Sequence, residues 1–139
     1  MRLNVSFRYA IYAVFVVLLL TGGAWLVADW RKDLSTDEIW QQSMAYLLMV
    51  HGGTAMVALL LLGALIPLHL MRAWRSGSNR FSGSVMVTFN ALLIVTAFGL
   101  YYLGSEVLRP WMSWLHIAAG VALALWFPLH IYLGRRRPT

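Results

Sequence analysis

The chain alternates between long apolar stretches and short polar segments. Four stretches contain about 20 residues or more with almost no charge, the length that a helix needs to cross the hydrocarbon core of a bilayer. They are Tyr9–Ala28, Met44–Met71, Val85–Leu103 and Trp111–Leu133. The segments between them are too short to form a separate soluble domain. The pattern therefore predicts an all-α, integral membrane four-helix bundle that occupies residues 1–139 as a single domain.

Composition agrees with a membrane protein, because 60% of the residues are hydrophobic and only 12% are charged. The first apolar stretch follows Arg2 and Arg8, as a secretory signal would, and Gly22–Ala24 would suit cleavage after Ala24. The apolar run continues to Ala28, which is longer than a usual signal core. We therefore expect a retained first helix.

Positive and negative side chains are separated along the chain. Arginines lie at both termini and between the second and third stretches, whereas all five acidic residues lie in the other two loops. By the positive-inside rule, both termini and the Arg72–Arg80 loop face the cytoplasm. We expect a multi-pass protein of the bacterial inner (cytoplasmic) membrane, with the lipid bilayer as its surroundings. The net charge of +6 is then a topology signal, and no nucleic-acid partner is expected.

All four histidines lie inside the apolar stretches: His51 and His69 in the second, and His116 and His130 in the fourth. At about 100° per residue of regular helix, the step from His51 to His69 returns to the same face, and the step from His116 to His130 ends about 40° from it. Polar side chains inside a bilayer are costly and usually functional. Since imidazoles from facing helices can fill both axial positions of a haem iron, the pattern predicts two haems that carry electrons.

The chain contains no cysteine, which excludes cysteine-ligated iron–sulfur clusters and covalent haem attachment. A haem would therefore be b-type. Gly52 follows His51, and Gly120 lies one turn after His116; both would let a flat macrocycle approach the backbone. The same glycines also suit ordinary helix packing.

The chain also repeats itself. Ile66–His69 matches Phe127–His130, and arginines follow both segments. Leu19–Gly22 shows a weaker similarity to Ile94–Ala97. The repeat predicts two helical hairpins related by an axis along the membrane normal, so that the two histidine-bearing helices run in the same direction.

This direction pairs His51 with His116 toward the outer face and His69 with His130 toward the inner face. The two spacings do not match. On a regular helix His51 and His69 are about 27 Å apart, whereas His116 and His130 are about 21 Å apart. A tilt would absorb the difference, as would a kink at the proline that precedes each inner histidine by two residues. The alternative is that the inner pair is not a haem site.

Four membrane helices with two pairs of histidines resemble the small bacterial di-haem b-type cytochromes of the cytochrome b-561 kind. These include the cytochrome-b membrane subunits of hydrogenases and formate dehydrogenases. The absence of histidine from the first stretch is similar to respiratory cytochrome b, where two helices supply all four ligands. The resemblance implies two haem b groups, electron exchange with quinone or quinol, and a redox partner protein, in a quinone-linked oxidoreductase or electron-transfer subunit. The small size of the chain also suits a homodimer, and Arg109 is a candidate to bind a haem propionate or a quinone.

A second interpretation makes the histidines hydrogen-bonded packing residues of a non-redox protein, such as a small transporter or assembly protein. Zinc or copper transport would usually add carboxylates or thiolates to the imidazoles, and no acidic residue lies inside a span. Several other side chains are expected only to pack or to cross-link helices. They are Met49, Met56, Met71, Met86, Thr21, Asn90 and Thr96.

Overall fold

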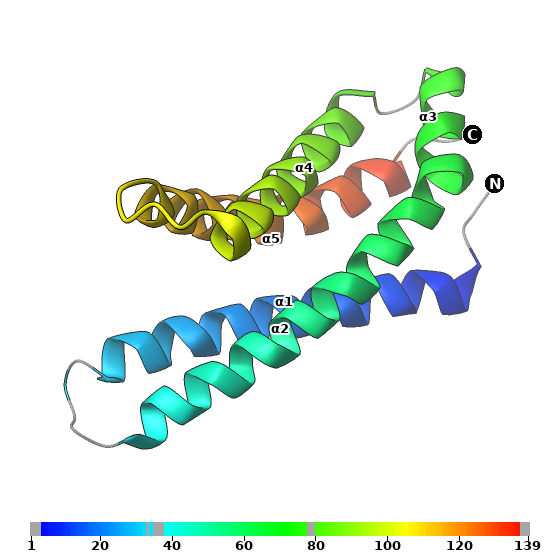
Figure 1. Ribbon diagram of the computed structural model, residues 1–139. Coiled ribbons are helices and arrows are strands. Elements are labelled where there is room, and N and C mark those ends of the chain that lie inside the picture. Colours follow the sequence, from blue (N-terminus) through cyan, green and yellow to red (C-terminus); the bar gives the residue numbers. More distant parts are fainter. Residues whose placement is uncertain (1–3, 33, 35–37, 78–79, 137–139) are drawn as a thin grey trace. The chain divides into compact units, whose positions relative to one another are not determined.

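The computed structural model describes residues 4–32, 34, 38–77 and 80–136, and these residues are almost entirely helical, with no strand (Figure 1). The elements are α1 (Val5–Lys32), α2 (Glu38–Leu65), the π-helical segment η1 (Ile66–Leu70), α3 (Met71–Ser76), α4 (Arg80–Tyr102) and α5 (Leu108–Arg136). Within the described ranges, four helical segments are long and apolar enough to cross a membrane. The prediction of an all-α, multi-pass membrane protein with four spans is confirmed.

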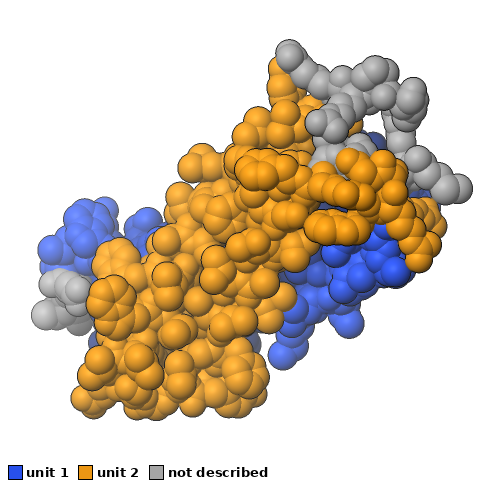
Figure 2. Space-filling view, turned by 90° about the horizontal axis from the view of Figure 1, so that it is seen from above, with its two compact units in different colours: residues 1–71 blue, residues 72–139 orange. Residues whose placement is uncertain are grey.

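The chain forms two compact units, residues 1–71 and residues 72–139 (Figure 2). In the first unit α1 packs along α2, and in the second α4 packs along α5. Each unit is therefore a helical hairpin, here called the first and the second hairpin, as the repeat predicts. The expectation that both hairpins belong to one domain stays a prediction.

The helices extend beyond the apolar stretches that predict them. α1 begins at Val5 and continues past Ala28 to Lys32, so that Gly22–Ala24 lie inside an unbroken helix. Lys32 forms an ion pair of 2.7 Å with Asp29 on the last turn, and its positive charge also suits the C-terminal end of the helix dipole. Charged residues at the membrane boundary thus continue the helix, although they end the hydrophobic pattern.

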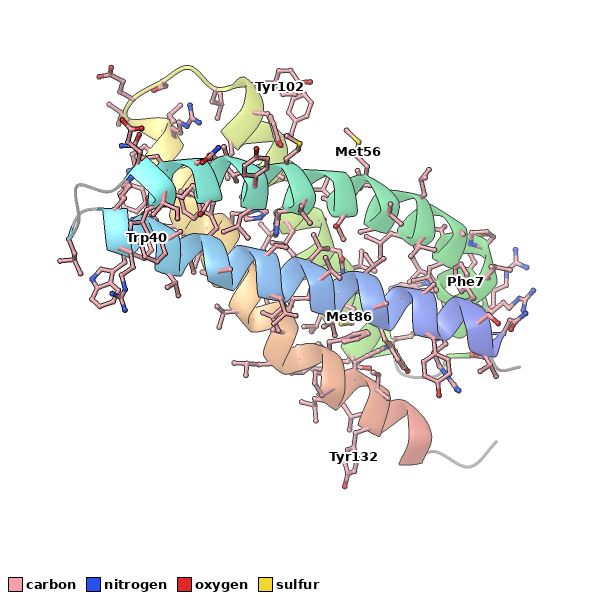
Figure 3. The ribbon with its side chains drawn as sticks, turned by 90° about the horizontal axis from the view of Figure 1, so that it is seen from below. Phe7, Trp40, Met56, Met86, Tyr102 and Tyr132 are labelled. Atoms are coloured by element: carbon pink, nitrogen blue, oxygen red, sulfur yellow. The ribbon has the colours of Figure 1, made fainter. Side chains whose placement is uncertain are left out.

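Large apolar side chains cover the outside of both hairpins. Leu60, Phe98 and Leu125 are 76%, 65% and 74% exposed, respectively. Lipid tails would cover such surfaces in a bilayer, where only the backbone polar groups need internal partners. Met56 is 71% exposed and Tyr132 is 47% exposed, and both point away from their own hairpin (Figure 3). Met56 therefore faces outward and does not pack between the two helices of its hairpin.

The seam within each hairpin is lined mostly by small or hydroxyl side chains. Its buried residues are Ile11, Ala28 and Ala58 in the first hairpin, and Ser82, Thr96, Gly99, Ala119 and Leu123 in the second. Small residues allow close helix contact where hydrophobic driving force is absent. At Gly99 a Cβ atom would lie 3.2 Å from the Cγ and Sδ atoms of Met112, so this position has little room for a side chain. The buried polar side chains of the seam are therefore small ones with hydroxyl groups, Ser82 and Thr96.

The two matching prolines have different effects. Pro67 lies in η1, where the Met71 N–H bonds the Ile66 carbonyl five residues earlier, whereas Pro128 lies inside a continuous α5. A proline removes one backbone donor and disturbs the preceding turn, and a π-helical turn is one way to accommodate it. The same four-residue pattern therefore gives a π-helical turn in one hairpin and a regular helix in the other.

Candidate functional site

His51 is half-buried on α2 and faces α1. Its Nδ1 atom lies 2.9 Å from Oγ1 of Thr21, and this oxygen lies 2.7 Å from the Val17 carbonyl one turn earlier. A hydroxyl has a single proton and a carbonyl only accepts, so Thr21 donates to Val17 and accepts from the imidazole. In the neutral ring the proton is then on Nδ1. The lone pair is on Nε2, which is suited to ligate a metal.

The second hairpin contains the same arrangement. Nδ1 of His116 on α5 lies 2.9 Å from Oγ1 of Thr96 on α4. The Thr96 hydroxyl lies 2.6 Å from the Leu92 carbonyl, so it too donates along its own helix and accepts from the ring. His116 therefore has the same tautomer, with its lone pair on Nε2.

These two contacts extend the sequence repeat to the level of side-chain hydrogen bonds. Thr21 and Thr96 occupy the matching positions of the weaker repeat, and each contacts the outer histidine of its own hairpin. The sequence suggested only that the threonines cross-link helices. Their role in orienting the histidines was missed, although the repeat itself was the signal that could have revealed it.

His130 has a hydroxyl partner as well. Its Nδ1 atom lies 3.1 Å from Oγ of Ser82 on α4. The Ser82 carbonyl accepts a hydrogen bond of 3.4 Å from the indole Nε1 of Trp126, so α4 and α5 are linked twice at this level. With Thr21 and Thr96 aligned, the first hairpin has Phe7 at the position of Ser82, and phenylalanine offers no hydroxyl. The two hairpins therefore match at the outer histidines and differ at the inner ones.

His69 lies in η1 and is exposed. On a regular α-helix His69 would lie on the same face as His51. The wider π-helical turn changes the rotation about the helix axis between His51 and His69, so these two residues do not share a helix face. In the second hairpin α5 is continuous, and the angular relation between His116 and His130 stands.

The glycines next to the outer histidines have open or ordinary surroundings. Gly52 lies partly exposed on α2, and its neighbour Gly53 has nothing within 4 Å of where a Cβ atom would lie. Gly53 and Val50 belong to an apolar groove of about 410 Å³ between α1 and α2. On α5, a Cβ atom at Gly120 would lie 3.9 Å from Leu93 of α4, an ordinary packing distance. Gly53 thus borders an open groove that His51 does not line, whereas Gly120 takes part in the seam.

Arg109 is exposed in the first turn of α5. Its backbone N–H bonds the Ser105 carbonyl at 3.0 Å, which holds the start of the helix. Tyr101 and Tyr102 end the preceding helix and are each 73% exposed. Arg109, Tyr101 and Tyr102 are therefore all exposed near this end of the second hairpin.

The indole of Trp25 is half-buried on α1, and its Nε1 atom is buried without a hydrogen-bond partner. It is the one such side-chain nitrogen or oxygen atom among the described residues. A buried donor with no partner costs about 1–3 kcal/mol. Trp25 lies one turn beyond Thr21 and was not singled out from the sequence. An unsatisfied donor at this place is the kind of group that a bound molecule can satisfy.

The outer histidines carry imidazole donors of the kind that haem iron accepts. Within the described part of the chain, no three histidine or acidic side chains come together to hold a metal ion. A haem iron takes four ligands from its macrocycle and needs only two from protein. Imidazoles with Nδ1–H bonded to an oxygen acceptor are typical metal ligands, because this bond fixes the tautomer and the ring orientation. The residues present therefore fit a haem with axial imidazoles.

Comparison with known proteins finds no matching family model, no matching curated protein and no matching solved structure. The resemblance to di-haem cytochromes rests on the helices and histidines alone.

Proposed function

We propose that this protein is a membrane b-type cytochrome that carries electrons between the quinone pool and a partner protein or small acceptor. Its histidines would hold two haem b groups, His51 with His116 and His69 with His130. The bacterial inner membrane is the expected location, on the basis of the arginine distribution. The observation that carries the proposal is the pair of hydroxyl–imidazole bonds at Thr21 and Thr96.

These bonds favour ligation because of their direction. If the threonines served only to join two helices, either direction of hydrogen bonding would serve. In both hairpins the threonine hydroxyl donates its proton to a backbone carbonyl of its own helix. Its oxygen can therefore only accept a hydrogen bond from the imidazole. In both outer imidazoles the lone pair is then on Nε2, a nitrogen with which histidine commonly ligates a metal.

Bound haem iron supplies one-electron chemistry, so the two electrons of a quinol would leave singly and its two protons would pass to water. The protein's contribution would be to hold each haem group by two imidazoles and, through the hydroxyls of Thr21, Thr96 and Ser82, to orient three of these rings. Arg109, at the end of the second hairpin, is the proposed contact for a quinone oxygen or a haem propionate. A cation there would favour the addition of negative charge during reduction.

The experiment is a redox titration of the full-length protein, purified in detergent from cells with ample haem. We expect two b-type components, each with the spectrum of low-spin bis-histidine iron. His51→Ala and His116→Ala should each alter the same component and leave the other low-spin. A quinol analogue added to the oxidised protein should then reduce the haem rapidly.

A non-redox protein would give a different result in these experiments. Structural histidines would give a colourless protein, and histidine replacement would lower stability without any spectroscopic change. If His51→Ala and His116→Ala altered different components, the pairing and the parallel arrangement behind it would be wrong.

A further inference from the structure

Trp25 has a buried donor with no acceptor in the protein, and its position indicates what could supply one. It lies four residues beyond Thr21 on α1, which is about 6 Å along the helix axis and about 40° around it. Three residues further on, Ala28 is buried against the neighbouring helix with 3% exposure. Trp25 is therefore between two positions of the buried face, one turn from the level at which Thr21 holds His51.

In the second hairpin the indole of Trp126 has a partner, because its Nε1 atom donates to the Ser82 carbonyl. The unsatisfied donor is thus particular to the first hairpin. In the second hairpin the position that matches Trp25 is Leu100, which has no donor.

An indole N–H only donates, so its partner must present an acceptor. Hydrocarbon tails offer none, and the Nε1 atom is shielded from solvent. The carboxylate of a haem held at His51 and the carbonyl oxygen of a quinone share the required chemistry, an oxygen acceptor within about one helical turn of the histidine. We infer that Trp25 is a positioning residue that donates its indole N–H to such an oxygen of a molecule bound beside His51. This inference rests on the proposed function.

The test is Trp25→Phe in the full-length protein, which removes the N–H and keeps an aromatic ring. Trp30→Phe is the matched control, since Trp30 lies on the same helix and is 62% exposed. If the acceptor is a haem carboxylate, the lost donor leaves more negative charge near the iron and disfavours the reduced state. At a fixed potential near the midpoint, the ferrous-to-ferric ratio of the outer haem should then fall about threefold to tenfold, with the other haem unchanged.

If the acceptor is a quinone, both haem potentials should stay unchanged in Trp25→Phe. The KM for a quinol analogue should instead rise about fivefold, with kcat nearly constant. Unchanged potentials together with unchanged quinol kinetics would overturn the inference while leaving the proposed function intact. Wild-type protein without haem would overturn both.

A measurement on the unmodified protein covers the case in which Trp25→Phe fails to fold. Resonance Raman spectra of the indoles should show one strongly hydrogen-bonded N–H, in addition to that of Trp126, only in protein that contains the bound molecule. If the indole signals of the loaded and the haem-depleted protein were identical, Trp25 would have no such partner.

Discussion

Replacing Thr21 by valine removes one hydroxyl and keeps nearly the same shape. The Val17 carbonyl keeps its helical hydrogen bond, so the main loss is the Thr21 hydroxyl as an acceptor 2.9 Å from Nδ1 of His51. The Leu18 carbonyl remains as a second acceptor for this ring. A bond between neutral groups contributes about 0.5–1.5 kcal/mol net. For a one-electron couple, where about 59 mV corresponds to a tenfold change, this energy amounts to roughly 20–60 mV.

The sign follows from the direction of the bond. Donation from Nδ1–H makes the imidazole a stronger base, which stabilises ferric iron more than ferrous iron. Thr21→Val should therefore raise the midpoint potential of the outer haem, by at most about 60 mV. Thr21→Ser should restore the wild-type value, because it returns the hydroxyl.

The assay is a spectroelectrochemical titration of purified protein, with Thr54→Val as the control. The Thr54 hydroxyl on α2 donates to the Val50 carbonyl of the same helix at 2.7 Å. Thr54→Val therefore removes the same type of local hydrogen bond as Thr21→Val. The reasoning is refuted if Thr21→Val and Thr54→Val give the same potentials, or if the outer haem becomes harder to reduce. In the double variant with Thr96→Val, both shifts should fall on one component if the outer histidines share a haem.

Three further predictions address other parts of the structure. Ser82→Ala should change the potential or occupancy of the haem at His130 and leave the outer haem unaltered, as measured by the same titration. Pro67→Ala should allow α2 to continue as a regular helix through η1, so the spectrum should change only for the haem that His69 ligates; an effect on the outer haem would contradict the pairing. Arg109→Ala should slow reduction by quinol about tenfold with haem content unchanged in stopped-flow measurements, and unchanged kinetics would remove Arg109 from the site.

The helices could be predicted because membrane length and hydropathy leave few alternatives. Their ends could not, because residues such as Asp29 and Lys32 stop the hydrophobic pattern but still form an ion pair that supports the last turn of α1. Backbone hydrogen bonds continue wherever the chain favours them, whether or not the side chains are apolar.

The different outcomes at Pro67 and Pro128 depend on lateral support. Counting outward from the Thr21–His51 contact along antiparallel helices puts η1 level with the first residues of α1, where the neighbouring helix begins. By the same count from the Thr96–His116 contact, Pro128 is level with Ser84 in the second turn of α4. It lies between Trp126 and His130, both bonded to Ser82. The local sequence around a proline does not show which residues of another helix lie beside it, so the backbone conformation at Pro67 and Pro128 could not be predicted from it.

The four histidines were predictable as candidate ligands, because each is a polar group in a hydrophobic span. Their hydroxyl partners were harder to predict, since Thr21 and Ser82 lie 30 and 48 positions away from the histidines that they contact. Trp25 could not be distinguished from interfacial tryptophans until the burial of its Nε1 atom was known.

Haem stoichiometry measures whether the four histidines hold two haems. Full-length protein is expressed with ample haem, purified, and assayed as the pyridine haemochrome against protein concentration from amino-acid analysis. We predict about two b-type haems per chain, one for each histidine pair. A ratio near one would keep the outer site and remove the inner one, and colourless protein would contradict the account as a whole.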